Sequence, residues 1–136
     1  MIFPEIDEKE TKKNVKNLLG TYPHLIRRAS KMSAPKITSD YHLVVEVSLE
    51  KQQLAGDFSE NEEIEEEIKK IVRSINKLDL FERQLICDRF IRRKKTNVAL
   101  YMSYHVSESK FYREMAKALL HFAESYDHGR LLDSKE

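Results

Sequence analysis

The stretch from Thr96 to Tyr126 decides the fold, and it reads TNVALYMSYHVSESKFYREMAKALLHFAESY. Thr96 and Ser107 are good N-caps, because their hydroxyls can accept hydrogen bonds from the free amides of a first helical turn. After Ser107, apolar residues recur at helical spacing at positions 111, 115, 118, 119, 122 and 126. The pattern predicts a short helix, a tight turn near 105–107 and a long helix. Such a helix-turn-helix presents its second helix to a DNA groove.

The outward face of the second predicted helix mixes hydrogen-bonding and cationic side chains. We expect five residues to reach base edges: Glu108, Ser109, Lys110, Tyr112 and Arg113. We expect six to contact phosphate: Arg92, Arg93, Lys94, Lys95, Ser107 and Lys117. The run from 92 to 95 also has a structural explanation, since cations at the end of a helix complement its dipole. The sequence supports phosphate binding and dipole stabilisation by this run about equally.

Two more helices are predicted upstream. Asp79 and Glu82 have the spacing of a capping box, and an inward stripe with Leu85 and Phe90 follows. Before them, Ser59 and Glu62 form a second capping-box pattern, with apolar residues at 64, 68, 71, 72 and 75. Glutamates crowd residues 60–67 of this helix. They favour a solvated face over the alternative, a docking surface for a basic partner such as a polymerase subunit.

The amino-terminal segment predicts a helix from about Glu8 to Leu19, which residues 20–23 should end or bend. A second short helix would carry Leu25, Ile26, Ala29 and Met32 on one face. Cations face outward on both: Lys9, Lys12, Lys13, Lys16, Arg27, Arg28 and Lys31. They form either a second phosphate-contacting surface or a soluble exterior. The sequence favours the exterior, because basic helix faces are common.

Residues 42–49 alternate in the manner of a β-strand, but no second strand is evident in the sequence. An unpaired strand would have to pair outside this chain, for example with another copy in a homodimer. The alternative is a helix from near Asp40 toward Gln53. The two hypotheses are nearly equal. The polar end, from 128 to 136, is expected to fray.

Several of these segments resemble the ArpU-type phage transcriptional regulators, whose DNA-binding end is similar to region four of the sigma-70 factors. The resemblance covers roughly 1–32 and 60–126, with its clearest matches at 4–8, 75–79, 82–83, 89–90, 107–113, 118–119 and 122–123. It implies a regulator of phage or prophage late genes that binds double-stranded DNA and, in one alternative, RNA polymerase. His105 departs from the pattern where glycine is usual, and Tyr101 departs where a small residue is usual.

Composition limits the other classes of function. The 136 residues carry a net charge of +1. Between residues 80 and 117, however, there are nine cationic residues and only four acidic ones. The local charge determines whether this region can bind an anionic partner, because salt screens charged groups that lie more than about 8 Å apart. The five histidines lack metal-ligand spacing and Cys87 has no evident base, so neither an enzyme nor a cofactor is expected. The single cysteine and the absence of a long apolar run indicate a cytoplasmic protein without membrane contact. The resemblance implies that this cytoplasm is that of a bacterial host cell, with the protein at the nucleoid.

The sequence therefore predicts an all-α fold, a helical domain that ends in a helix-turn-helix, with a short isolated strand near 42–49. The expected division is an N-terminal helical segment (1–32), a variable connecting segment (33–58), the helix-turn-helix domain (59–127) and a frayed tail (128–136). Besides the DNA-binding regulator, two alternatives remain. One is a sigma-like factor or adaptor acting mainly through RNA polymerase, and the other is a helical packaging or interaction subunit whose helix-turn-helix faces protein.

Overall fold

The computed structural model describes residues 5–29, 32–46 and 58–134, with side chains from 62 onward in the last range. It is mostly helical, which confirms the all-α prediction. The helices are α1 (Glu8–Arg28), α3 (Phe58–Asn76), α4 (Leu80–Ile86), α5 (Asn97–Ser103) and α6 (Glu108–Ser125). A π-helical turn, η1 (Cys87–Arg92), extends α4, and a 3-10 turn, η2 (Tyr126–Gly129), follows α6. None of the helices in these ranges is long and apolar enough to cross a membrane.

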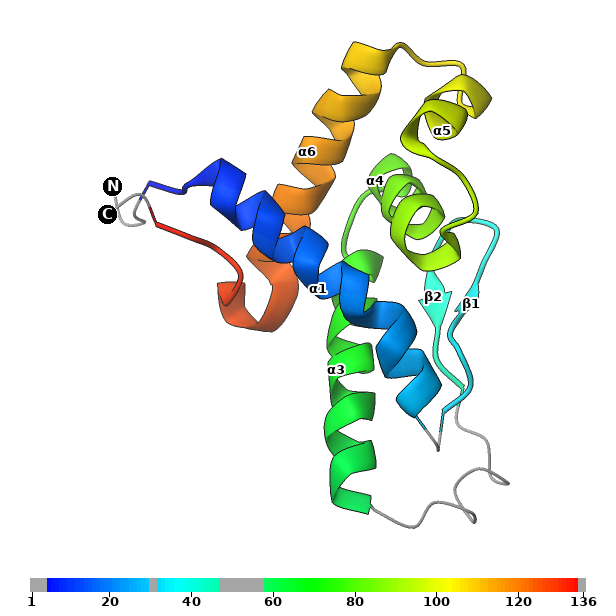
Figure 1. Ribbon diagram of the computed structural model, residues 1–136, viewed down its shortest axis with the longest axis vertical. Helices are drawn as coiled ribbons and strands as arrows, with labels where there is room; N and C mark the ends of the chain where they lie inside the picture. Colours follow the sequence, from blue (N-terminus) through cyan, green and yellow to red (C-terminus); the bar gives the residue numbers. More distant parts are fainter. Residues whose placement is uncertain (1–4, 30–31, 47–57, 135–136) are drawn as a thin grey trace.

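One hydrophobic core joins the segments that lie far apart in the sequence. Val15 and Leu19 of α1, Ile68 of α3, Leu85 of α4 and Phe122 of α6 are all buried in a single cluster. Figure 1 shows α1 crossing in front of α3 and α6, while α5 and the start of α6 project at one end of the molecule. Because α1 shares this core, the amino-terminal segment packs directly onto the helix-turn-helix.

The first helix is longer than the sequence indicated. α1 runs without a break from Glu8 to Arg28, so the expectation that residues 20–23 end it is wrong. Pro23 lacks an amide hydrogen and crowds the carbonyl four residues back, which bends a helix when packing holds both halves. Tyr22 and Ala29 are buried around this point, and the ribbon in Figure 1 changes direction there. No separate second helix forms over the described residues from 25 to 32.

The predicted core face of α3 is confirmed, since the apolar residues at 64, 68, 71, 72 and 75 are all buried. The helix begins at Phe58, one residue before the Ser59 start that the capping-box pattern predicted. Two of the glutamates of α3 have partners within the fold. Glu66 forms an ion pair with Arg73 at 2.9 Å, and Glu67 accepts a hydrogen bond from the Tyr126 hydroxyl. Glu62 and Glu63 are exposed to solvent.

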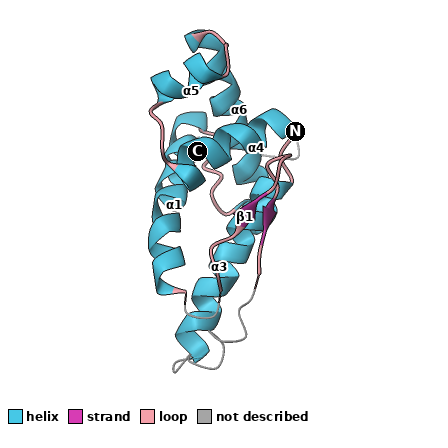
Figure 2. Cartoon of the chain, turned by 90° about the vertical axis from the view of Figure 1, so that its right-hand side faces the viewer, coloured by secondary structure: helices cyan, strands magenta, loops and turns pink. Residues whose placement is uncertain are grey.

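The expected isolated strand has a partner in its own chain. β1 (Lys36–Ile37) and β2 (Leu43–Val44) pair antiparallel, with Lys36 opposite Val44 and Ile37 opposite Leu43 (Figure 2). The alternative, a helix from near Asp40, is wrong up to residue 46, and both hypotheses extend beyond the described residues there. A strand of two residues has no periodicity, which is why the sequence did not reveal β1.

The other edge of β2 is covered by a side chain. The Asn76 amide accepts from the Leu43 N–H at 2.8 Å and donates to the Leu43 carbonyl at 3.0 Å. It thus satisfies both backbone groups that a further strand would have bonded. For residues 43–44, pairing with another copy is therefore not needed to satisfy the backbone, and the homodimer stays a prediction.

The frayed tail is also a wrong prediction for residues 128–134. After η2, the chain returns to the start of α1, where Ile6 and Ser134 form an antiparallel bridge. The Asp7 amide donates to the Asp133 carbonyl at 2.8 Å, and the Asp133 amide donates to the buried Thr11 hydroxyl at 2.9 Å. These contacts join residues more than 100 positions apart, which no local pattern encodes.

Candidate nucleic-acid interface

Two N-cap residues define where the helices of the helix-turn-helix begin. The Thr96 hydroxyl accepts from the Ala99 amide at 3.2 Å and starts α5, and the Ser107 hydroxyl accepts from the Lys110 amide at 3.1 Å and starts α6. Both predicted caps are confirmed. The upstream capping box is confirmed as well, with reciprocal hydrogen bonds between Asp79 and Glu82 at the start of α4.

His105 makes the turn in the conformation that usually requires glycine. Its φ is 58°, in the left-handed region that most side chains avoid. The His105 amide donates to the Met102 carbonyl, and the Val106 amide donates to the Tyr101 carbonyl, each at 3.2 Å. These bonds satisfy two carbonyls at the end of α5. The turn thus survives the replacement of glycine, as histidine tolerates a positive φ better than most residues.

Aromatic side chains set the spacing of the helices around the turn. Tyr101 of α5 lies 5.8 Å from the buried Phe111 of α6, measured between ring centroids. Tyr104 stacks on the same ring at 6.4 Å and meets Phe81 of α4 edge-on at 5.9 Å. A small residue at 101 would let the backbones approach closely, but here the three helices pack through rings. Such contacts add about 0.5 to 1.5 kcal/mol each to the burial of apolar area.

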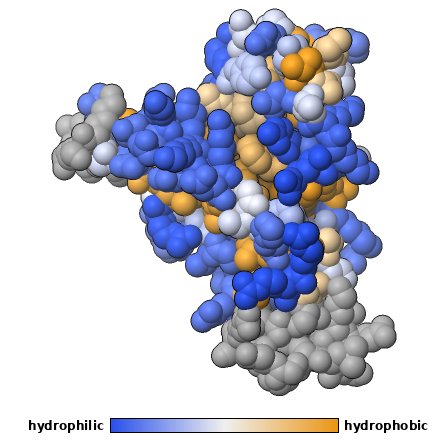
Figure 3. Space-filling view, in the orientation of Figure 1, coloured by the Kyte–Doolittle hydropathy of each residue, from blue (hydrophilic) through white to orange (hydrophobic). Residues whose placement is uncertain are grey.

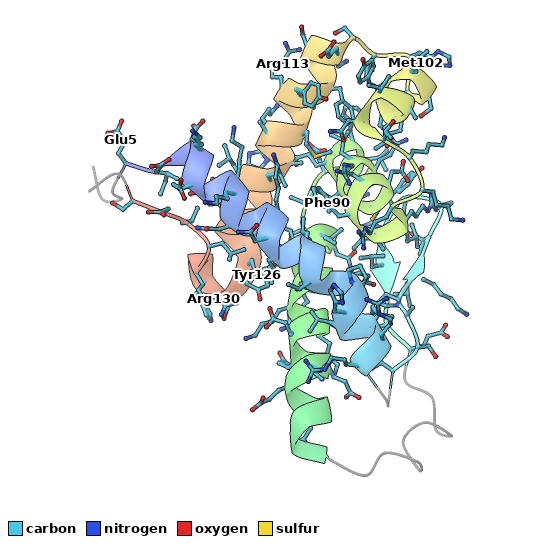
Figure 4. All side chains as sticks on the ribbon, in the orientation of Figure 1. Glu5, Phe90, Met102, Arg113, Tyr126 and Arg130 are labelled. Atoms are coloured by element: carbon cyan, nitrogen blue, oxygen red, sulfur yellow. The ribbon has the colours of Figure 1, made fainter. Side chains whose placement is uncertain are left out.

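The five predicted base-contacting residues are all exposed and are spread over roughly 200° of the helix circumference. Glu108, Ser109, Lys110, Tyr112 and Arg113 all lie on the solvent side of the first two turns of α6. Figure 4 places Arg113 at the outer end of this helix. Within the described part of the chain, neither Lys110 nor Arg113 has an ion pair. Their donors are thus open to a partner.

The six predicted phosphate-contacting residues are exposed too, but they are not equivalent. Arg92 pairs with Asp88 at 3.0 Å and lies over the Tyr41 ring at 5.4 Å, so its charge is partly neutralised. Lys117 lies 3.7 Å from Glu114. Arg93, Lys94 and Lys95 have no ion pair among the described residues and form the most available cationic group. The Ser107 hydroxyl caps α6 and keeps its O–H free to donate.

The loop that carries these cations is held by two side-chain contacts that the sequence did not predict. Asp88 of η1 accepts from the Tyr104 hydroxyl at 2.6 Å, and Arg89 donates to the Asn97 side chain at 2.8 Å. Burial and the bond to Asp88 raise the pKa of Tyr104, so this phenol stays protonated. Arg93 ends the π-helical turn with φ 56°. These contacts span 8 and 16 residues, and no sequence signal marks them.

Two of the residues considered for catalysis, Cys87 and His121, make contacts within the fold. Cys87 is fully buried, and this burial raises the pKa of its thiol to about 12, so it is inert near neutral pH. His121 lies 2.5 Å from Glu82, whose carboxylate is only 4% exposed, and completes the polar partners of that buried group. Across the described residues, no group of three histidine, cysteine, aspartate or glutamate side chains is arranged to hold a metal ion.

Comparisons with protein families, with curated proteins and with solved structures give no match. The similarity to ArpU-type regulators thus remains a prediction from the residues.

Proposed function

We propose that this chain is a sequence-specific DNA-binding transcriptional regulator whose helix α6 enters the major groove. The observation that carries the proposal is the exposed polar face of α6, from Glu108 to Arg113, directly after a capped turn. Arginine and lysine read guanine acceptors, and glutamate accepts from the cytosine amino group. Lys110 and Arg113 would therefore select guanines, Glu108 a cytosine, and Ser109 and Tyr112 would supply adaptable hydrogen bonds.

The phosphate contacts would come from the loop between η1 and α5. Most of the phosphate contacts would be made by Arg93, Lys94 and Lys95. The Ser107 hydroxyl and Lys117, one turn beyond the base-contacting residues, would add further contacts. Arg92 would contribute less, because Asp88 already neutralises part of its charge. Glu82, one of the four acids between residues 80 and 117, is buried against His121, and the Arg92–Asp88 pair removes one charge of each sign, so the outer surface keeps its cationic excess. Such a surface supports binding to duplex DNA.

The resemblance to ArpU-type proteins supplies the biology of the proposal. The regulator would act in the cytoplasm of a bacterial host, on phage or prophage late genes such as those for packaging, structure or lysis. It would need no cofactor. RNA polymerase would be a second partner if the protein activates rather than represses.

The test is a selection from a random DNA duplex pool, followed by affinity measurements across a range of salt concentrations. On the selected site, Arg113→Ala should cost about 1 to 3 kcal/mol and relax the preference at one base pair. Lys94→Ala with Lys95→Ala should weaken all sequences alike and flatten the salt slope by about 0.9 per lost contact. Equal losses from both variants on every sequence would contradict this division of roles.

The same experiment separates the alternatives. A sigma-like factor would select no site alone but would be retained with purified RNA polymerase and a promoter. A subunit whose helix-turn-helix faces protein would show no salt-dependent retention by duplex DNA, which would contradict the proposal.

A further inference from the structure

One flank of α1 is lined with lysines. Lys9, Lys12, Lys13 and Lys16 lie within roughly 100° of one another around a helix of 3.6 residues per turn. Glu10 and Asn14 lie on the other flank. The sequence alone favoured a solvated exterior for these lysines, and the question is which way the flank faces.

The carboxy-terminal tail orients this helix. Asn14 donates from its side chain to the Leu131 carbonyl at 3.1 Å, so the tail covers the flank opposite the lysines. On the lysine side, Lys16 lines a surface groove of about 340 Å³ together with Arg89, Arg93 and Tyr112. Arg93 and Tyr112 are among the residues proposed to contact DNA. Lys16 of the lysine flank therefore lines the same groove as Tyr112 and Arg93 of the proposed DNA-contacting set.

The chemistry of this groove is cationic above an apolar floor. Lys16, Arg89 and Arg93 are the charged residues that line it, and Leu19, Phe90 and Met115 supply apolar surface. Figure 4 places Phe90 between α1 and α4, and Figure 3 shows a strip of hydrophobic surface there between two hydrophilic regions. No acidic residue lines the groove. Lys13, Lys16 and Arg93 are exposed and make no ion pair with other described residues.

We propose that the lysine flank of α1 is a second contact with the DNA backbone, beside the site that α6 reads. The proposal rests on the proposed DNA-binding function and extends its footprint. Lys9 and Lys16 are separated by about 10 Å of helix, at 1.5 Å per residue, which is the axial rise of about three phosphates on one strand. A linear array of charge that continues from the recognition face suits a phosphate track better than it suits a compact acidic peptide.

The decisive measurement is the slope of log affinity against log salt concentration. The double variant Lys13→Gln/Lys16→Gln should flatten this slope by about 2, because each phosphate contact contributes about 0.9. The matched control is Lys36→Gln/Lys77→Gln, which removes the same charge. Lys36 pairs with Glu46 at 3.3 Å, and Lys77 lies in a groove with Glu66 and Glu124. The control should leave the slope unchanged.

A gain-of-contact variant strengthens the test. Gly20 lies one turn beyond Lys16 on the same flank, and a Cβ atom added there meets no atom within 4 Å. Gly20→Lys should steepen the slope by about 0.9.

Each outcome separates the two proposals. Unchanged slopes for all the α1 variants, with a flattened slope for Lys94→Ala, would overturn the α1 contact and leave the proposed function standing. Wild-type binding that ignores salt would overturn both. If Lys13→Gln/Lys16→Gln instead abolishes binding of a labelled poly-glutamate peptide and spares DNA, the groove accepts acidic protein and the α1 contact is refuted.

Discussion

The two ends of α6 differ in what holds them. At the carboxy-terminal end, Phe122 and Tyr126 are fully buried and stacked at 5.6 Å. The Tyr126 hydroxyl donates to Glu67 and accepts from Arg130 at 2.9 Å, and Figure 4 shows Tyr126 and Arg130 far from the outer end of the helix. At the amino-terminal end, Phe111 is the one buried residue among 107–113.

This contrast shows how one helix combines a buried, supporting end with an exposed end, the one that we propose reads DNA. Arg113 and Phe122 are nine residues apart, about 14 Å along the axis, so changes at one end need not disturb the other. The buried end fixes the direction of α6, and the exposed end faces solvent. Stability and recognition should therefore respond to different substitutions.

The largest expected loss of stability comes from a substitution at the buried end of α6. Phe122→Ala should lower the free energy of unfolding by about 3 to 5 kcal/mol, because it removes a ring and leaves a cavity. Urea unfolding followed by circular dichroism measures this loss. Arg113→Ala, at the exposed end, should change the same quantity by less than about 0.5 kcal/mol. Comparable losses from the two variants would mean that the ends are not energetically separate.

A smaller loss of stability is expected from a substitution at the exposed end of α6. Ser107→Ala should cost about 1 kcal/mol, since the Lys110 amide loses its cap. Hydrogen exchange should speed up at the first-turn amides of α6. Ser125→Ala is the matched control, because that hydroxyl donates to the Phe122 carbonyl at the other end and caps nothing. Faster exchange near Ser125 in the Ser107 variant would argue against a local cap.

The smallest effect tests the turn. His105→Gly should raise stability by less than about 1 kcal/mol, because the relief of a left-handed conformation slightly exceeds the entropy that glycine loses on folding. His105→Val should lower it, since a β-branched residue fits φ 58° poorly. Thermal unfolding of the three proteins gives the order. If valine proves more stable than glycine, the proposed strain at this turn is wrong.

The parts of the fold that the sequence predicted correctly are local. The caps at Thr96, Ser107 and Asp79 act over three residues, and the apolar stripes of α3 and α6 repeat within a few turns. The exposed positions on α6 followed from the same periodicity. The candidate interface was therefore largely predictable, residue by residue, on its helical side.

The parts that it did not predict depend on distant contacts. Asn76 completes the edge of β2 from 33 residues away, and the tail pairs with Asp7 and Thr11 across more than 100 residues. Packing on both sides kept α1 continuous through Pro23, against the local preference of proline. The Asp88–Tyr104 bond that anchors the basic loop belongs to the same group.

The sequence by itself determined where the helices after residue 58 start, which faces they bury and which charges stand near the turn, because caps and periodicity act within one or two turns of chain. Tertiary structure alone decided that α1 lies across α6, with Lys16 in the same groove as Tyr112 and the other flank of α1 under the returning tail. The physical reason is that this arrangement comes from burying a shared core and pairing backbone groups between segments at opposite ends of the chain, whose energies no local stretch contains.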